Sequence, residues 1–307
     1  MRAFRFFPYL LCFFSCCVVG QESGTTNVPP DPFGSLEAEG KAADFSMPVD
    51  RTRGTFQLDA KDGKYQPGSH FANWFWTMKP GRPGKYYAGL VYDSSRPKLG
   101  VQLKVGKDAV LKSYAPRTNP LSNDEPLVLG YVHLPEVSDY DVMLLTGDQS
   151  NVPAFQVKGI HFRPAPHEEP LGQSIDGSIE LEAKSATTYA VEMRYEPKAE
   201  KNCLGYWRQK EDWAEWVFDV TDPGTFEVSV FYGCGNGNEG SKVAVLANEK
   251  TMEFTVEDTG GFQKWREVKL GEVALNEKGE NHLAIVPLDL KGKSVMDIQK
   301  VVLKSTK

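Results

Sequence analysis

The chain has 307 residues, a net charge of −6, and 40% hydrophobic and 25% charged residues. Its length suits about two globular domains. The acidic balance, with no run of basic residues, argues against nucleic acid or an anionic membrane surface as a partner. Past the N-terminus, no stretch is apolar enough to predict a membrane span.

The first twenty residues have the pattern of a secretory signal peptide. Arg2 and Arg5 give a basic start, residues 6–19 are almost wholly apolar, and small residues precede Gln21. The apolar core is shorter than the roughly 20 residues of a membrane span. A lipid anchor on Cys16 or Cys17 is the less favoured alternative, because the preceding residues fit a lipobox poorly. We expect a secreted protein, or one exported to the periplasm or cell envelope.

Two polar stretches rich in proline suggest the domain boundaries. Residues 21–34 are predicted to form a flexible leader. Residues 164–175 have the composition of a linker. The expected domains are therefore residues 35–163 and 176–307.

Both halves show the alternation of β-strands. In residues 213–220 the even positions are apolar, and in residues 225–232 Phe226, Val228 and Val230 share one face. An Asp-Pro-Gly turn lies between these segments and predicts a hairpin. Many short strands without helical periodicity favour an all-β protein built from jelly-roll β-sandwiches.

The two halves also resemble each other in sequence, which predicts a tandem duplication whose first copy has diverged. The matched segments, at offsets of 140 to 145 residues, are 36–39 with 181–184, 73–76 with 215–218, 83–86 with 223–226, 129–132 with 270–273, and 157–162 with 298–303.

Two of the five cysteines, Cys203 and Cys234, lie outside the predicted signal peptide. In an oxidising compartment they favour one disulfide, and two buried free thiols are the alternative.

Several motifs of the second half occur in an order that is similar to a known family. They are Cys203-Leu-Gly-Tyr-Trp207, Glu211-Asp-Trp-Ala-Glu-Trp216, Gly233-Cys-Gly235 and Glu257-Asp-Thr-Gly260. This succession resembles the galactose-binding-like β-sandwich, the carbohydrate-binding type of module appended to secreted bacterial sulfatases and α-L-fucosidases. The first half lacks the Gly-Tyr-Trp and Asp-Thr-Gly segments, and the chain lacks the catalytic domain that such modules accompany.

Sugar binding needs an aromatic face for the pyranose ring and a few polar groups for its hydroxyls. Tyr206, Trp207 and Trp213 are the aromatic candidates, with Trp213 on the polar side of its strand. Asn236 and Asn238 are the candidate hydrogen-bonding partners. Aromatic residues of a sandwich also commonly fill its core, and the two asparagines also suit an ordinary hairpin loop.

The resemblance further implies a structural calcium ion between an early Glu-x-Glu strand and a late aspartate. Glu180, Glu182 and Asp297 match that placement, and carboxylate oxygens suit calcium. Three solvated carboxylates without a metal are the alternative.

No nucleophile elbow, zinc spacing or phosphate-binding loop stands out in the sequence. The hypothesis is therefore a secreted, non-catalytic protein that binds a polysaccharide or other glycan. The alternative is a structural or adhesion protein whose sandwiches bind a protein partner in the cell envelope. A glycoside-active enzyme is a third, less favoured alternative.

Overall fold

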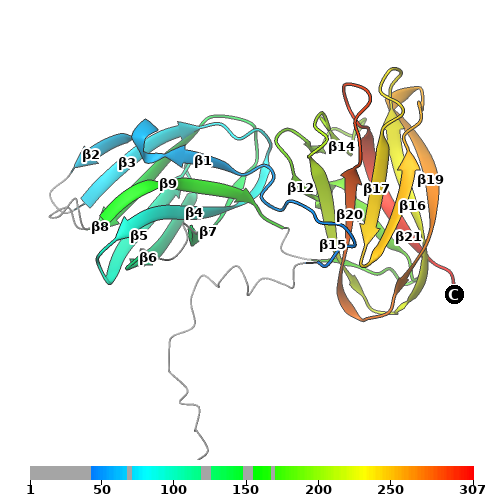
Figure 1. Ribbon diagram of the computed structural model, residues 1–307, viewed down its shortest axis with the longest axis horizontal. Coiled ribbons are helices and arrows are strands. Elements are labelled where there is room, and N and C mark those ends of the chain that lie inside the picture. The colour runs from blue at the N-terminus through cyan, green and yellow to red at the C-terminus, as the bar shows by residue number, and fades with distance from the viewer. Residues whose placement is uncertain (1–42, 68–70, 119–125, 148–154, 167–169) are drawn as a thin grey trace, which may run out of the picture.

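The computed structural model describes residues 43–67, 71–118, 126–147, 155–166 and 170–307. The predicted signal peptide, with Cys16 and Cys17, and the predicted leader lie outside these residues. Nearly all the regular structure is β, so the all-β prediction is confirmed (Figure 1). No helix in the described part of the chain is long and apolar enough to cross a membrane.

The first half forms two antiparallel sheets, with strand orders β1-β9-β4-β7 and β2-β3-β8-β5-β6. Their apolar faces enclose one core, which includes Trp76, Leu90 and Phe162. The elements are β1 (Phe56–Asp59), the 3-10 turn η2 (Ala60–Asp62), β2 (Lys64–Pro67), β3 (Phe71–Met78), β4 (Gly84–Ser94), β5 (Lys98–Val105), β6 (Ala109–Pro116), β7 (Leu127–Leu134), β8 (Tyr140–Gly147) and β9 (Phe155–Pro164).

The second half forms two more sheets around a larger core. One has the order β13-β14-β21-β16-β19 with β11 beside β21, and the other β10-β15-β20-β17-β18 with β12 beside β15. The elements are β10 (Leu171–Gly172), β11 (Ile179–Glu182), η4 (Ala183–Ser185), β12 (Thr187–Tyr189), β13 (Arg194–Glu196), β14 (Cys203–Gly205), β15 (Trp213–Val220), β16 (Gly224–Cys234), β17 (Lys242–Ala247), β18 (Lys250–Thr255), β19 (Gly261–Leu275), β20 (Gly279–Pro287) and β21 (Asp297–Ser305).

The predicted strands 213–220 and 225–232 exist, and their predicted apolar faces line the second core. The predicted hairpin is wrong, because β15 pairs with β20 whereas β16 pairs with β19 and β21. The Asp-Pro-Gly segment therefore connects two sheets across the core. Alternation alone predicts the same buried face in either arrangement.

The two halves share strand order and local detail. Trp76 on β3 donates its indole N–H to the carbonyl of Asp59, just before η2. Trp216 on β15 donates in the same way to Glu182, just before η4. These tryptophans are equivalent at an offset of 140 residues, so the sequence match of residues 73–76 with 215–218 is shifted by two.

A bulge also recurs at equivalent places. The register of β4 with β7 shifts after Ala88, opposite Gly130, and that of β16 with β19 shifts after Val228, opposite Gly271. Both glycines have positive φ angles, 138° and 117°, which side chains rarely adopt.

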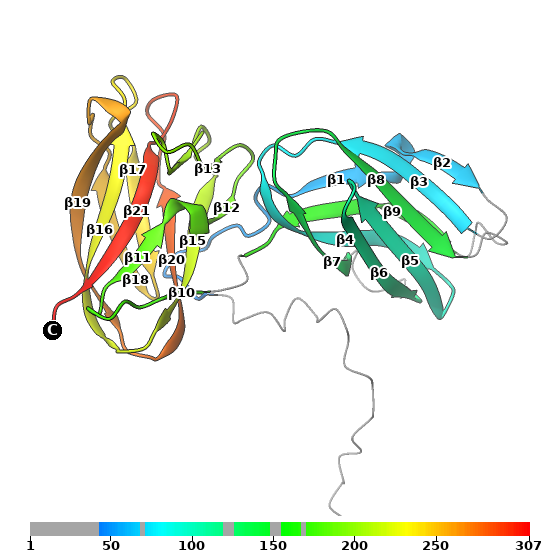
Figure 2. The ribbon, with the colours of Figure 1, turned by 180° about the vertical axis from the view of Figure 1, so that it is seen from behind.

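Residues 43–53, which we call the strap, lie against the second half although they precede β1 (Figure 2). Phe45, Met47 and Val49 pack on the outer face of the sheet that contains β15, over Trp213 and Tyr189. Further contacts join the strap to the segment before β15. Arg53 pairs with the buried Asp212 at 2.8 Å.

Candidate functional site

The two tryptophans predicted to bind sugar are both buried. Trp207 has no exposed surface and donates its indole N–H to the carbonyl of Asp212. Trp213 is 2% exposed, stacks on Tyr189 with ring centroids 4.2 Å apart, and donates to the carbonyl of Asp50. The expectation of an exposed Trp213 is wrong because the strap covers that face. Neither ring offers a face to a ligand in this arrangement.

The predicted asparagines lie in the turn after β16. Asn238 accepts from the backbone N–H groups of Lys293 and Ser294 and donates to the carbonyl of Gly235. Its amide therefore holds two loops together. Asn236 is exposed in the same turn. Among the described residues, no hydrogen bond joins either asparagine to Tyr206.

The three carboxylates predicted for calcium are not brought together. Glu180 pairs with Lys300 at 2.6 Å, and Glu182 pairs with Lys184. Asp297 is buried and lies in a different group of side chains. These three residues therefore do not fit a shared calcium site here. Whether the protein binds a structural calcium ion stays untested.

The predicted disulfide is wrong, since Cys203 and Cys234 are both free and buried. Their strands, β14 and β16, lie on opposite sides of β21. Strands two places apart are separated by roughly 9.6 Å, beyond the Cα distance of about 7 Å that a disulfide spans. In addition, Cys234 belongs to the core, whereas Cys203 contacts Asp297 on the outer side of the sheet.

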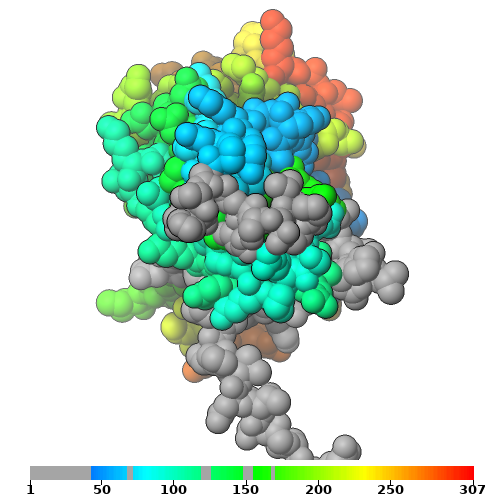
Figure 3. Space-filling model, turned by 90° about the vertical axis from the view of Figure 1, so that its left-hand side faces the viewer, coloured from blue at the N-terminus to red at the C-terminus, as the bar shows by residue number. Residues whose placement is uncertain are grey.

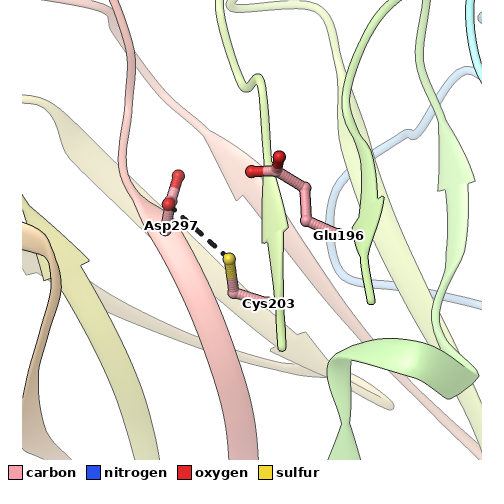
Figure 4. A group of neighbouring side chains, drawn as sticks. All are labelled: Glu196, Cys203 and Asp297. Atoms are coloured by element: carbon pink, nitrogen blue, oxygen red, sulfur yellow. Dashed lines mark hydrogen bonds between the residues drawn. The ribbon is translucent and has the colours of Figure 1, made fainter. Parts of the chain in front are cut away.

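Asp297 lies instead with Glu196 and Cys203 (Figure 4). Glu196 and Cys203 face each other across β13 and β14, and Asp297 begins β21, the next strand. One ligand atom from each residue lies within 4.8 Å of the others. In the described part of the chain, this is the one group of three or more such side chains whose spacing suits a metal ion.

Polar neighbours hold this cluster in place. The Sγ atom of Cys203 lies 3.6 Å from Oδ2 of Asp297, and the amide of Gln263 donates to the same oxygen at 3.0 Å. Lys201 pairs with Glu196 at 2.6 Å. A Cβ at Gly205 would lie 2.4 Å from Oε2 of Glu196, so a larger residue there would displace this carboxylate from its present position.

Two aromatic side chains border the cluster. Tyr206 follows β14 with a φ of 60° and is half-buried. The guanidinium of Arg194 lies 3.7 Å from the centroid of the Tyr206 ring. The ring of Phe262, next to Gln263 at the start of β19, lies against Gly235, where a Cβ would approach it to 3.1 Å, and the backbone carbonyl of Phe262 lies against Gly233.

Burial dominates the electrostatics of the cluster. It raises the pKa of Asp297 to about 7, and the nearby charge of Glu196 acts in the same direction. Burial, with the charge of Asp297, also raises the pKa of the Cys203 thiol. The thiol is therefore neutral at neutral pH, and Asp297 keeps its proton to a higher pH than an ordinary carboxyl group does.

The arrangement offers carboxyl, amide and ammonium groups for hydrogen bonds beside two aromatic rings. Of this group, Tyr206 was predicted from the sequence as a sugar ligand. Asp297 was predicted only for calcium, and Glu196, Gln263 and Phe262 were not predicted. The Gly260-Gly261-Phe262-Gln263 segment follows the Asp-Thr-Gly motif and was the available signal.

Residues 185–307 match the family model described as "Domain of unknown function (DUF5077)". This match spans less than half of the chain. No curated protein matches the chain.

Solved structures similar to the chain include carbohydrate-binding modules. The C-terminal CBM6 of LamC, a marine laminarinase from Zobellia galactanivorans, is 17% identical, with 42% of this chain and 99% of that chain covered and a TM-score of 0.33. A family 35 module from Clostridium thermocellum is also 17% identical, with 42% and 98% covered and a TM-score of 0.33. A β-1,3-glucan-binding CBM6 from Bacillus halodurans is 11% identical, with 45% and 100% covered and a TM-score of 0.31. Because these TM-scores are low, the all-β fold rests on the strands of this chain itself.

Proposed function

We propose that the protein is a secreted, non-catalytic glycan-binding protein. Its binding site is the end of the second half where Tyr206 and Phe262 border Glu196, Gln263 and Asp297. The observation that carries the proposal is the convergence of fixed polar groups from β13, β14, β19 and β21. Two half-buried aromatic residues adjoin these groups along the chain, Tyr206 directly after β14 and Phe262 directly before Gln263.

The chemistry of the site suits sugar. Aromatic rings stack on the apolar C–H face of a pyranose, and carboxyl and amide groups bond its hydroxyls. Gln263 and Cys203 fix the orientation of Asp297, and Lys201 fixes that of Glu196. Such preorganised groups lower the entropic cost of binding.

The carboxyl pair suits binding better than catalysis. Asp297 already bonds to Cys203 and Gln263, and Glu196 is held by Lys201. A hydrolase needs two carboxyl groups free to contact the scissile bond from its two sides. Absence of reducing-sugar release from any bound polysaccharide is the expected result.

The alternative, a protein-docking module, predicts a large apolar patch. The exposed large hydrophobic side chains of the described residues are instead scattered over both halves. They are Tyr65, Val110, Tyr114, Val137, Ile175 and Val191. This pattern supports a glycan over a protein partner.

A glycan array followed by affinity electrophoresis tests the proposal. Tyr206→Ala and Phe262→Ala are each expected to weaken binding about fivefold or more, since an aromatic contact contributes on the order of 1 kcal/mol or more. Tyr65→Ala, an exposed aromatic residue of the first half, is the matched control and should bind normally.

Trp213→Ala separates this site from the one predicted from the sequence. It should lower the melting temperature but leave the affinity of the folded protein unchanged, because the Trp213 ring lies under the strap. If the wild-type protein binds no glycan on a broad array, or if both site variants bind normally, the proposal is wrong.

A further inference from the structure

The outer face of the sheet β2-β3-β8-β5-β6 in the first half carries a row of apolar side chains between lysines. Cross-strand register places Lys64 beside Phe75, Phe75 beside Met143, and Met143 beside Lys104. The core residues of these strands, such as Trp76, Val142 and Leu103, point to the opposite side. Successive side chains of a strand alternate between faces, so this row lies on the outside.

The next row on the same face is polar. Register places Gln66, Asn73, Leu145, Gln102 and Lys112 side by side across the five strands. The side-chain oxygen of Asn73 is enclosed and has no hydrogen-bond partner among the described residues. The amides of Gln66, which is exposed, and Gln102, which is half-buried, can bond the hydroxyls of a ligand that lies across this face.

Tyr114 and Lys98 extend the face along β5 and β6. Tyr114 is 61% exposed, and the Nζ atom of Lys98 lies 4.0 Å from the centroid of its ring. The five strands span roughly 20 Å from β2 to β6 at the usual strand spacing. The first half faces the viewer in Figure 3.

The charge of this face is opposite to that of the chain, whose net charge is −6. Neither row contains an acidic residue. The acidic residue of β8 on this face is Asp141, two residues before Met143 and beside Thr77. The side chains of Lys64, Lys104 and Lys112 are exposed and form no ion pair with a described residue. The face therefore presents unpaired positive charge around an apolar and amide-bearing centre.

The equivalent face of the second half is covered by the strap. Trp76 and Trp216 are equivalent, so Asn73, three residues before Trp76, corresponds to Trp213. Met143 corresponds to Ala284, because β8 pairs with β3 as β20 pairs with β15. By the same comparison, Lys104 in the first half corresponds to Leu246 in the second half. The second half thus has apolar residues where the strap packs.

The first half has an amide, a methionine and a lysine at these positions, so two of the three apolar contacts of the strap are replaced by polar groups and the face suits a more hydrophilic occupant than a second apolar strap. We propose that this face, which we call the lysine face, binds an anionic polysaccharide, a glycan chain bearing carboxylate or sulfate groups. The proposal rests on the proposed function of glycan binding, which it extends to a second site and a charged substrate class. The lysines attract the anionic groups, while the amides and Tyr114 contact the sugar rings.

The test measures binding of the full chain to polygalacturonate and to neutral mannan by affinity electrophoresis and titration calorimetry. The triple variant Lys64→Gln, Lys104→Gln, Lys112→Gln should bind polygalacturonate at least tenfold more weakly. The control variant Lys158→Gln, Lys278→Gln, Lys304→Gln removes the same charge from exposed lysines elsewhere and should bind like the wild type. Tyr114→Ala should also weaken binding without changing the net charge.

The outcomes separate the two proposals. Binding of polygalacturonate that survives in Tyr206→Ala but fails in the triple variant supports the lysine face, whatever happens with neutral glycans. Equal loss in the control variant, or equally tight binding of polyglutamate, would show mere attraction to polyanions and overturn the lysine face. Binding of glycans with no effect of the triple variant would overturn the lysine face alone.

Discussion

Asp297 is the residue whose environment differs most from its expected role. As a calcium ligand it would be ionised, but the structure surrounds it with a thiol, an amide and a second carboxylate. Its pKa, raised to about 7 by burial, makes the folded state take up a proton that the unfolded chain releases near pH 4. This difference links its ionisation to stability.

The sign of this linkage gives a prediction. Between pH 4 and 7 the unfolded state binds fewer protons at this site, so the free energy of unfolding decreases as the pH rises through that window. Asp297→Asn cannot ionise and should remove this decrease. Above pH 7 the variant should be more stable than the wild type, by on the order of 2–4 kcal/mol. Urea denaturation of the wild type and of Asp297→Asn at pH 4.5, 6 and 8 measures these free energies of unfolding.

Asp222→Asn is the control, because that carboxylate is 73% exposed and should leave the pH profile unchanged. A profile of Asp297→Asn that parallels the wild type would contradict the burial of an ionisable carboxyl group. A variant that is less stable than the wild type at pH 8 would instead indicate that the charged form is held by a bound cation.

At single positions, the alternation of residues identified the face of the strand on which a side chain lies, but not the other segment of the chain that covers that face. Alternation placed Trp213 on the outer side of its strand correctly, yet the strap that buries it comes from more than 160 residues earlier in the chain. Nothing in the local pattern of residues 213–220 reports that contact. Similarly, Glu196 reaches Asp297 only because β14 pairs with both β13 and β21. Such pairings are long-range and leave no local signal.

At the level of elements, strand positions were predictable and strand partners were not. The apolar faces of β15 and β16 line the core as alternation predicts. The Asp-Pro-Gly segment between them suits both a hairpin and a connection between sheets. The recurrent Gly130 and Gly271 lie at equivalent bulges, so this part of the sequence match reflects a real backbone constraint.

The strap behaves as an additional layer on the second half. Its residues alternate, with Phe45, Met47 and Val49 half-buried and the residues between them exposed. Arg51 reaches Glu215, which also bonds to His282 at 3.0 Å. An extended segment with a few apolar contacts and two ion pairs should open locally more easily than the core strands.

Val49→Asp tests this view of the strap. A carboxylate placed against Trp213 and its apolar neighbours is costly to bury, and each ~1.4 kcal/mol of local destabilisation raises the open population about tenfold. Trypsin should therefore cut after Arg51 and Arg53 at least ten times faster, as measured by mass spectrometry of the fragments. Asp44→Asn changes charge on the exposed side without adding a trypsin site and should not alter the rate. Equal rates in all three proteins would mean that the strap does not depend on this packing.

At the scale of the whole molecule, the two halves repeat one arrangement of strands but differ on their surfaces. From β3 and β15 onward, cross-strand register, the paired tryptophans and the bulges place equivalent residues at offsets of 140 to 142, and the duplication itself stays a prediction. The motifs that border the candidate site occur in the second half alone. The first half is distinguished by its lysine face, and this division follows from side chains rather than from topology.

Buried charges join the halves. Asp212, with no exposed surface, bonds to Arg53 through one oxygen, and its other oxygen has no partner among the described residues. Arg82, before β4, is 4% exposed and feels the charge of Asp212, and burial lowers its pKa. Two of its nitrogen atoms are enclosed without a described partner. These groups avoid water only while the halves stay together.

This coupling predicts how the protein unfolds. Asp212→Ala leaves Arg53 without its carboxylate and removes a negative charge near Arg82, and breaking a buried pair in this way costs about 3–5 kcal/mol. Because that loss falls on the junction, calorimetry should show one transition for the wild type and two separate transitions for the variant, with the first below the wild-type melting temperature. Asp219→Ala, at the far end of β15, should keep a single transition. Two transitions already present in the wild type, or a single unshifted one in Asp212→Ala, would show that the halves unfold independently of this contact.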